Sequence, residues 1–275
     1  MARRLVQQGL VTRLRSELVV VSRNVSIDVS GSRSEISRRL GARLLKSGEV
    51  VVEECAGGPR LAPKSGRDLL SVLEGLDWKH LGAGRRREAS RESGGSFVLG
   101  TTLGVAGSRG YDSVANVGVS RGARGASRSI LKEGYYFAKY GEQLRLLWRL
   151  CRAAVASVDP GYRFTSLQVN RDFDGRPHVD RNDVSYQYAL SLGHFTGGRL
   201  VVATDDLLRF RILDTHLRVT RCDGRHPHWV TKYVGGPRYS LVMYRVEGRG
   251  SERESNLRGR CRPVPIVEAL PRRYV

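Results

Sequence analysis

Apolar and polar residues alternate along much of the second half of the chain. The stretch Phe164-Thr-Ser-Leu-Gln-Val-Asn170 shows this pattern, which places successive side chains on opposite faces of a strand. Clusters of Gly and Asp punctuate the segments that follow, where we predict strands at Val184–Leu192, Arg199–Ala203, Leu217–Arg221, Trp229–Val234 and Tyr239–Arg245. Several short strands at this spacing predict a sandwich or a barrel.

Helical periodicity dominates three other segments. Ser32-Arg-Ser-Glu35 is a capping box that precedes an apolar helical face ending at Leu44. A second short helix is predicted at Leu69–Leu76. Between Lys139 and Val158 the apolar residues again share one face, and Asp159-Pro-Gly161 predicts the end of that helix. Short apolar runs predict further strands at Leu18–Val21, Val50–Val52 and Phe97–Gly104.

Composition divides the chain into three parts. Residues 82–128 are rich in Gly, Ser and Arg, and the apolar island Phe97–Gly104 interrupts them. We therefore predict an N-terminal α/β lead-in or accessory region at residues 1–95, a main domain at residues 96–250 and a basic tail at residues 251–275. Because strands dominate the main domain, the expected fold class is mainly β with flanking helices (α+β).

The chain is strongly basic, with 47 Lys and Arg residues against 27 Asp and Glu and a formal net charge of +20. Such a charge concentrates polyanions around a protein and favours nucleic acid as a partner. A general preference for arginine in a GC-rich genome explains the composition equally well. No apolar run approaches the ~20 residues of a membrane helix, so no membrane partner is expected.

The cysteines favour an intracellular location. Their positions are far apart in sequence and form no CxxC pair: Cys55, Cys151, Cys222 and Cys261. This spacing is typical of reduced thiols rather than of a disulfide framework or a zinc site. The opening residues carry several arginines and no acid, as organelle transit peptides do. The nucleus and an organelle are therefore both possible locations. The sequence does not determine the oligomeric state.

Two potential metal ligands follow the first predicted strand of the main domain. His178 and Asp180 are two residues apart, so on an extended segment both side chains point the same way. Non-haem Fe(II) binds two imidazoles and one carboxylate on one face and keeps its other face open. An HxD pair also arises by chance in surface loops, so the hypothesis depends on a third ligand.

The third ligand is sought among the later histidines. His226 and His228 both follow the Asp223-Gly224 turn, and both are candidates. We favour His228 because it begins an apparent strand that would hold it inward from a fixed backbone. His194 and His216 are expected to be structural or exposed.

Arg238 and Ser240 form a second pair with the same spacing, on the last predicted strand. A guanidinium group binds a carboxylate through two parallel hydrogen bonds, and a serine hydroxyl on the same face can add another. Arginine at a strand end usually faces solvent. Arg238 differs from such solvent-facing arginines because it follows the distal histidine. This position indicates a pocket for the 5-carboxylate of 2-oxoglutarate.

Together these residues resemble the pattern of the 2-oxoglutarate/Fe(II) dioxygenase superfamily, which is HxD, a long gap, a distal His and then Arg-x-Ser. The resemblance implies a double-stranded β-helix (jelly roll) core. It implies that three residues hold Fe(II), namely His178, Asp180 and His228. It also implies 2-oxoglutarate as a co-substrate held by Arg238 and Ser240, with O2 as the oxidant. Asn170 stands where members place a residue that contacts this co-substrate.

A finer resemblance is to the TET/JBP-like branch found in many algae and protists. The similar positions are Thr165–Asn170, His178, Asp180, Asn182, Ser185, Ala189, Leu190, Gly193, Phe195–Gly198, Asp223, Gly224, Pro227, His228 and Arg238–Ser240. This branch implies oxidation of the methyl group of 5-methylpyrimidines in nucleic acid. Cys222 departs from the branch, because an aromatic residue is commoner at its position.

Three functions stay open from the sequence alone. The first is an oxygenase that hydroxylates a C–H bond in nucleic acid. The second is the same chemistry on a protein side chain or a small molecule. The third is a non-catalytic jelly-roll module that binds nucleic acid. A cupin-like metal isomerase would leave Arg238 and Ser240 without a role.

Overall fold

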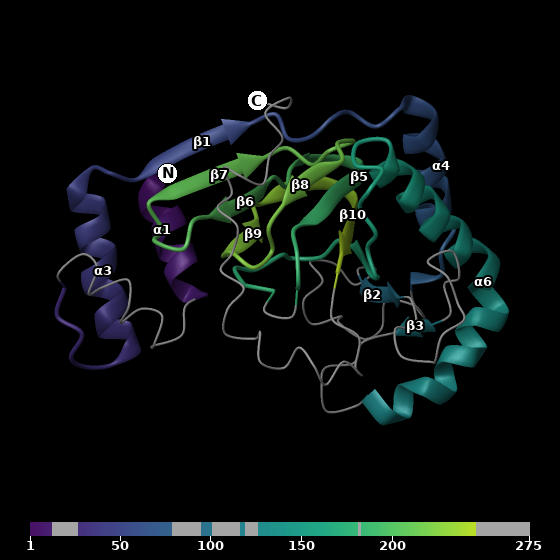
Figure 1. The fold of residues 1–275 in the computed structure, drawn as a ribbon, viewed down its shortest axis with the longest axis horizontal. Coiled ribbons are helices and arrows are strands. Elements are labelled where there is room, and N and C mark those ends of the chain that lie inside the picture. The colour runs from purple at the N-terminus through teal and green to yellow at the C-terminus, as the bar shows by residue number, and fades with distance from the viewer. Residues whose placement is uncertain (13–26, 79–94, 101–115, 119–125, 181–182, 246–275) are drawn as a thin grey trace.

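The computed structural model describes residues 1–12, 27–78, 95–100, 116–118, 126–180 and 183–245, with backbone alone at 116–118 and 126–140. Two β-sheets form its centre. The six-stranded sheet has the order β3-β2-β4-β10-β5-β8, and the four-stranded sheet has the order β1-β7-β6-β9. The two sheets lie between a pair of helices on one side and a second pair on the other (Figure 1).

The strands have the following bounds. The six-stranded sheet contains β2 (Gly95–Gly100), β3 (Asn116–Gly118), β4 (Ser166–Arg171), β5 (Gln187–Gly197), β8 (Thr220–Cys222) and β10 (Tyr233–Tyr244). The four-stranded sheet contains β1 (Val51–Cys55), β6 (Leu200–Ala203), β7 (Arg209–Leu213) and β9 (His228–Val230). All pairings are antiparallel except that of β1 with β7, which is parallel.

From β4 to β10 the chain winds between the two sheets in the order of a double-stranded β-helix. After β4, His178 forms a bridge with His228 of β9 and so joins the edge of the four-stranded sheet. The chain then returns to the six-stranded sheet in β5, crosses to β6 and β7, and alternates through β8, β9 and β10. This is a jelly-roll arrangement. The predicted fold class, mainly β with flanking helices, is confirmed.

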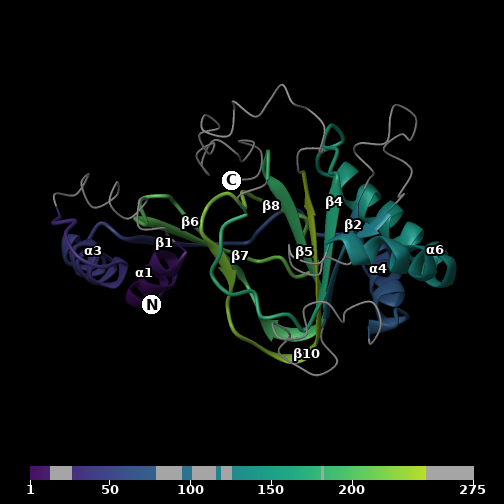
Figure 2. The same ribbon diagram turned by 90° about the horizontal axis from the view of Figure 1, so that it is seen from below.

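Each sheet is covered on its outer face by two helices (Figure 2). Helices α1 (Ala2–Val11) and α3 (Arg33–Ser47) pack against the four-stranded sheet, where Leu40, Phe210 and Trp229 share one apolar core. Helices α4 (Pro63–Glu74) and α6 (Ala126–Ala156) pack against the six-stranded sheet around Trp148, whose ring lies 4.6 Å from that of Phe164. The space between the sheets is therefore left for a functional site.

The N-terminal segments are tied to the main domain by these contacts. Strand β1 adds to the four-stranded sheet beside β7, and Leu69 of α4 is fully buried in the core around Trp148. The arginine- and glycine-rich stretches around β2 and β3, and the basic tail, mostly lie outside the described residues. No helix among the described residues is long and apolar enough to cross a membrane.

Local predictions agree with the structure at some places and differ at others. The capping box at Ser32 is present in both directions with Glu35. Helix α6 begins well before the predicted Lys139, and the predicted strand at Leu18–Val21 lies outside the described residues. The strand predicted from Leu217 begins only at Thr220, because Leu217 has a φ of 55°, which is outside the β region.

Candidate metal centre

The two candidate imidazoles are neighbours across the sheet. His178 and His228 lie directly opposite each other and exchange both backbone hydrogen bonds, with N–O distances of 3.0 and 2.9 Å. Opposite residues in an antiparallel pair project their side chains from the same face. The two rings accordingly lie 4.2 Å apart between their centres.

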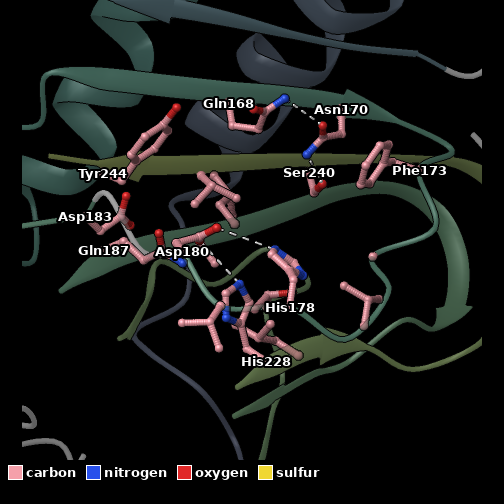
Figure 3. Close-up of a pocket in the computed structure, with 18 of the residues that line it drawn as sticks. Gln168, Asn170, Phe173, His178, Asp180, Asp183, Gln187, His228, Ser240 and Tyr244 are labelled. Carbon is pink, nitrogen blue, oxygen red and sulfur yellow. Dashed lines mark hydrogen bonds and ion pairs between the residues drawn. The ribbon is translucent and has the colours of Figure 1, made fainter. Parts of the chain in front are cut away.

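Asp180 completes a cluster with both histidines. Its backbone N–H donates to the carbonyl of Gly224 at 2.8 Å, which fixes the segment that carries it. Its Oδ1 lies 3.6 Å from Nε2 of His178, and its Oδ2 lies 3.4 Å from Nε2 of His228. One ligand atom from each residue lies within 4.8 Å of the others. The three side chains converge on one point (Figure 3).

Both imidazoles turn the same nitrogen toward this point. The Nδ1 atom of His178 lies 2.6 Å from the carbonyl of Arg176, and that of His228 lies 2.9 Å from the carbonyl of His226. A carbonyl only accepts, so each Nδ1 carries a proton, and each Nε2 is the ring nitrogen that faces Asp180 and that binds a metal once it is deprotonated. This is the arrangement that orients histidine ligands in metal sites. Donor types and orientation therefore fit Fe(II).

The local charges keep one carboxylate ionised. Burial opposes ionisation of Asp180, but the hydrogen bond to His228 and the charges of both histidines hold its pKa below the usual value. Burial alone would lower the pKa of His228. The Asp180 carboxylate has the larger combined effect, so the pKa of His228 is raised. Burial, together with the charge of Asp180, raises the pKa of the nearby Asp183 to about 8. Asp180 is thus the carboxylate suited to binding a cation.

Two further residues hold Asp180 in position, and sequence reasoning did not find either role. Gln187 of β5 is buried beside Asp180 and helps to lower the pKa of its carboxyl group. A Cβ atom on Gly224 would lie 2.7 Å from both Oδ2 of Asp180 and Nε2 of Gln187. Glycine is therefore required at 224 for the carboxylate to take this position. The one sequence signal for Gln187 is a polar residue in an otherwise apolar strand.

Arg238 and Ser240 line the same cavity as the three candidate ligands. This cavity has a volume of about 540 Å³. The Arg238 side chain is buried, donates to the carbonyl of Gly198 at 3.2 Å and lies over the rings of Phe195 and Tyr233. Its Nε has no hydrogen-bond partner among the described residues, and none of their carboxylates forms an ion pair with it. Burial lowers the pKa of Arg238 to about 10. This buried cation is suited to an anionic ligand.

Asn170 is held by a chain of hydrogen bonds beside Ser240. Its Nδ2 donates to the Ser240 hydroxyl at 3.1 Å, and its Oδ1 accepts from Gln168 at 3.0 Å (Figure 3). The same Oδ1 also accepts from Ser96 at 2.6 Å. Gln168 also donates to the hydroxyl of Ser96. Because Asn170 donates to Ser240, the Ser240 hydroxyl hydrogen is free to point at a ligand. The roles of Ser96 and Gln168 were not predicted.

The other histidines lie apart from the cluster. His226 is buried with its Nδ1 3.3 Å from Oδ1 of Asp205, so the structure brings His228 and not His226 to the candidate ligands. His216 lies against Phe195 and 3.1 Å from the carbonyl of Gly193, as expected of a structural histidine. His194 is exposed, also as expected.

No family model matches the chain, and neither does any curated protein. The solved structures that are similar include the following three. NgTET1 in complex with 5mC DNA has 15% identity over 68% of this chain and 70% of that chain, with a TM-score of 0.35. A 2OG-Fe(II) oxygenase family oxidoreductase from Burkholderia pseudomallei has 19% identity over 47% and 59%, with a TM-score of 0.27.

The third is a prolyl hydroxylase from Trichoplax adhaerens in complex with a hypoxia inducible factor oxygen degradation domain peptide fragment. It has 12% identity over 69% of this chain and 81% of that chain, with a TM-score of 0.34. The chain is similar in structure to 2OG-Fe(II) oxygenases. Because these scores are low, the jelly-roll arrangement of this chain is recognised from its own strand connectivity.

Proposed function

We propose that the protein is an Fe(II)- and 2-oxoglutarate-dependent oxygenase that hydroxylates a substrate C–H bond. One observation carries this proposal. A single cavity contains a cluster of two imidazoles and one carboxylate, and the same cavity contains a buried arginine without a carboxylate partner among the described residues. A metal and an organic acid would satisfy both groups at once.

In this proposal His178, Asp180 and His228 bind Fe(II) on one face and leave the opposite face open. Arg238 binds the 5-carboxylate of 2-oxoglutarate through its guanidinium group, and the Ser240 hydroxyl donates a further hydrogen bond. Bound Fe(II), with 2-oxoglutarate and O2, supplies the oxidant for hydroxylation. The protein's share is to orient these groups.

Several apolar side chains line the cavity that contains the metal ligands and the arginine. Ala189, Leu190, Leu200, Val230 and Val242 line the cavity with apolar surface. Apolar lining lowers the local polarity around bound groups, which strengthens the electrostatic contacts that they make.

For the substrate we propose the methyl group of a modified pyrimidine in nucleic acid. The net charge of +20 supports this choice, because it favours binding to phosphates. The resemblance to the TET/JBP-like branch supports it as well. The cavity lies within the usual range for small-molecule sites, so a single nucleoside would have to leave a duplex to enter it.

Turnover of 2-oxoglutarate tests the chemistry. We expect the purified protein with Fe(II) and O2 to release succinate, and His178→Ala to reduce this release by at least about a hundredfold, because a ligand is lost. His194→Ala is the matched control and should retain full turnover, since His194 is exposed. Equal turnover by wild type and His178→Ala would exclude the enzyme and favour a binding module.

Methylated oligonucleotides test the substrate. Nucleoside mass spectrometry after incubation should show oxidised methylpyrimidine with wild type and none with His178→Ala. Binding to the same oligonucleotide should weaken steeply with salt. Succinate release without any oxidised nucleoside would support the oxygenase chemistry but not the nucleic-acid substrate. The substrate would then be a protein side chain or a small molecule.

A further inference from the structure

A second cavity, of about 600 Å³, lies beside β8 at the edge of the six-stranded sheet. We call it the tyrosine cavity, after Tyr186 and Tyr188 in its wall. The connection from β1 to α4 borders it through Gly57 and Gly58, which lie against the backbone of Asp214 and Val219. Figure 1 shows this connection along the top of the molecule.

The tyrosine cavity is separate from the cavity that contains the metal ligands. The two have no lining residue in common. Tyr186 and Tyr188 flank Gln187 in the extended segment that leads into β5, so their side chains point away from Asp180, which Gln187 contacts. The proposed oxygenase function assigns no role to this cavity.

The aromatic wall is rigid. Both tyrosine hydroxyls donate to Oδ2 of Asp159, at 2.9 Å from Tyr186 and 3.0 Å from Tyr188. This carboxylate, also in the cavity wall, is therefore already occupied by two donors. The two rings lie 6.0 Å apart at an interplanar angle of 83°. Tyr186 also stacks on Tyr162, with 5.0 Å between ring centres and an interplanar angle of 27°, so Tyr188 and the edge of Tyr186 are the aromatic surface that is left to a ligand.

Two arginines supply positive charge with unused donors. The guanidinium of Arg221 lies 3.6 Å above the ring of Tyr186, and its buried Nε has no hydrogen-bond partner among the described residues. None of the described carboxylates forms an ion pair with Arg221. Arg211 donates from Nε to Glu53 at 3.2 Å. Its buried Nη1 has no hydrogen-bond partner among the residues that the structure describes.

We propose that the tyrosine cavity binds a small planar aromatic anion. The aromatic part would pack against Tyr188 and the edge of Tyr186, and the anionic group would accept hydrogen bonds from the guanidinium groups of Arg211 and Arg221, which line the cavity. A neutral ligand would leave Arg221 without a negatively charged partner among the described residues. An aliphatic anion would satisfy the donors but lose the contact with the rings.

Calorimetric titration with 2-naphthoate, a planar aromatic carboxylate, tests this assignment. We expect saturable binding to the folded full chain, with an affinity at least about tenfold above that of the neutral 2-naphthamide. Arg221→Gln and Arg211→Gln should each weaken binding by about tenfold or more. Arg209→Gln is the matched control, because Arg209 also lies on β7 and near Glu53 but does not line the cavity.

Two measurements separate this site from the proposed active site and from effects on folding. Arg238→Gln removes the other buried arginine and should leave naphthoate binding unchanged, which keeps the test independent of oxygenase activity. Cys55 lines the tyrosine cavity, so saturating naphthoate should slow alkylation of its thiol by iodoacetamide in the wild-type protein. This second readout needs no variant.

Four results would overturn the assignment. They are no saturable binding to wild type, equal affinity for the amide and the carboxylate, loss of binding in Arg238→Gln, and alkylation of Cys55 at the same rate with and without naphthoate. Wild-type affinity in both Arg211→Gln and Arg221→Gln, with circular dichroism unchanged, would overturn it as well.

Discussion

At the scale of single residues, Gly224 sets where the Asp180 carboxylate can lie. We expect Gly224→Ala to weaken Fe(II) binding by about tenfold, because the added methyl group would displace Oδ2 of Asp180 and Nε2 of Gln187. Titration of the apoprotein with Fe(II) under anaerobic conditions measures this. Gly161→Ala is the control, since its methyl group would make only ordinary contacts. Unchanged Fe(II) affinity in Gly224→Ala would contradict the role of this glycine.

Ser96 is linked to the proposed co-substrate through Asn170 and Ser240, by a chain of three hydrogen bonds. Ser96→Ala removes a donor to Oδ1 of Asn170 and loosens the amide that donates to Ser240. We expect the KM for 2-oxoglutarate to rise about fivefold with little change in kcat, as for loss of one hydrogen bond. Steady-state succinate release gives both constants. Ser157→Ala, at the end of α6, should change neither, and a fall in kcat alone would refute this reading.

These residues show what the sequence could and could not predict about the site. His178 and Asp180 were predictable because a spacing of two residues has a fixed meaning on an extended segment. Gln187 and Ser96 were not, because each acts through a contact with a strand far away in sequence. The choice of His228 over His226 depended on expecting a strand at 228, and the structure has β9 there.

At the scale of elements, the start of α3 was the most predictable feature, because the capping box is local. Ser32→Ala should lower the free energy of unfolding by about 1 kcal/mol through loss of the N-cap. Urea unfolding followed by circular dichroism measures the change. Ser37→Ala, in the interior of the helix, should leave stability equal or slightly higher. A loss in Ser37→Ala equal to that in Ser32→Ala would exclude capping as the cause.

Strand β7 shows why some elements were missed. Its sequence Arg209-Phe-Arg-Ile-Leu213 alternates, but the Asp205-Asp206 pair just before it indicates a loop, so the local pattern predicts no strand there. In the structure β7 pairs in parallel with β1, more than a hundred residues earlier in the chain, and Arg211 forms an ion pair with Glu53 on that strand. Such a pairing partner cannot be read from the local pattern of residues.

At the scale of the whole molecule, the proposed ligands would join the two sheets. His178 and His228 come from the edge of the four-stranded sheet, whereas Arg238, Ser240 and Asn170 come from the six-stranded sheet. Each sheet has its own apolar core with its own pair of helices. A metal bound to one side and an organic acid bound to the other would therefore stabilise the packing of the two layers.

This arrangement predicts additive thermal stabilisation. With redox-inert Mn(II) replacing Fe(II), ligand at a hundred times its Kd should add about 2.7 kcal/mol to the free energy of unfolding and raise Tm. Adding 2-oxoglutarate to the metal-loaded protein should raise Tm further. His228→Ala should abolish the response to Mn(II), whereas Arg238→Gln should keep that response and lose only the one to 2-oxoglutarate. If Arg238→Gln still responded fully to 2-oxoglutarate, the acid would bind elsewhere, and the two sheets would not be joined through this cavity.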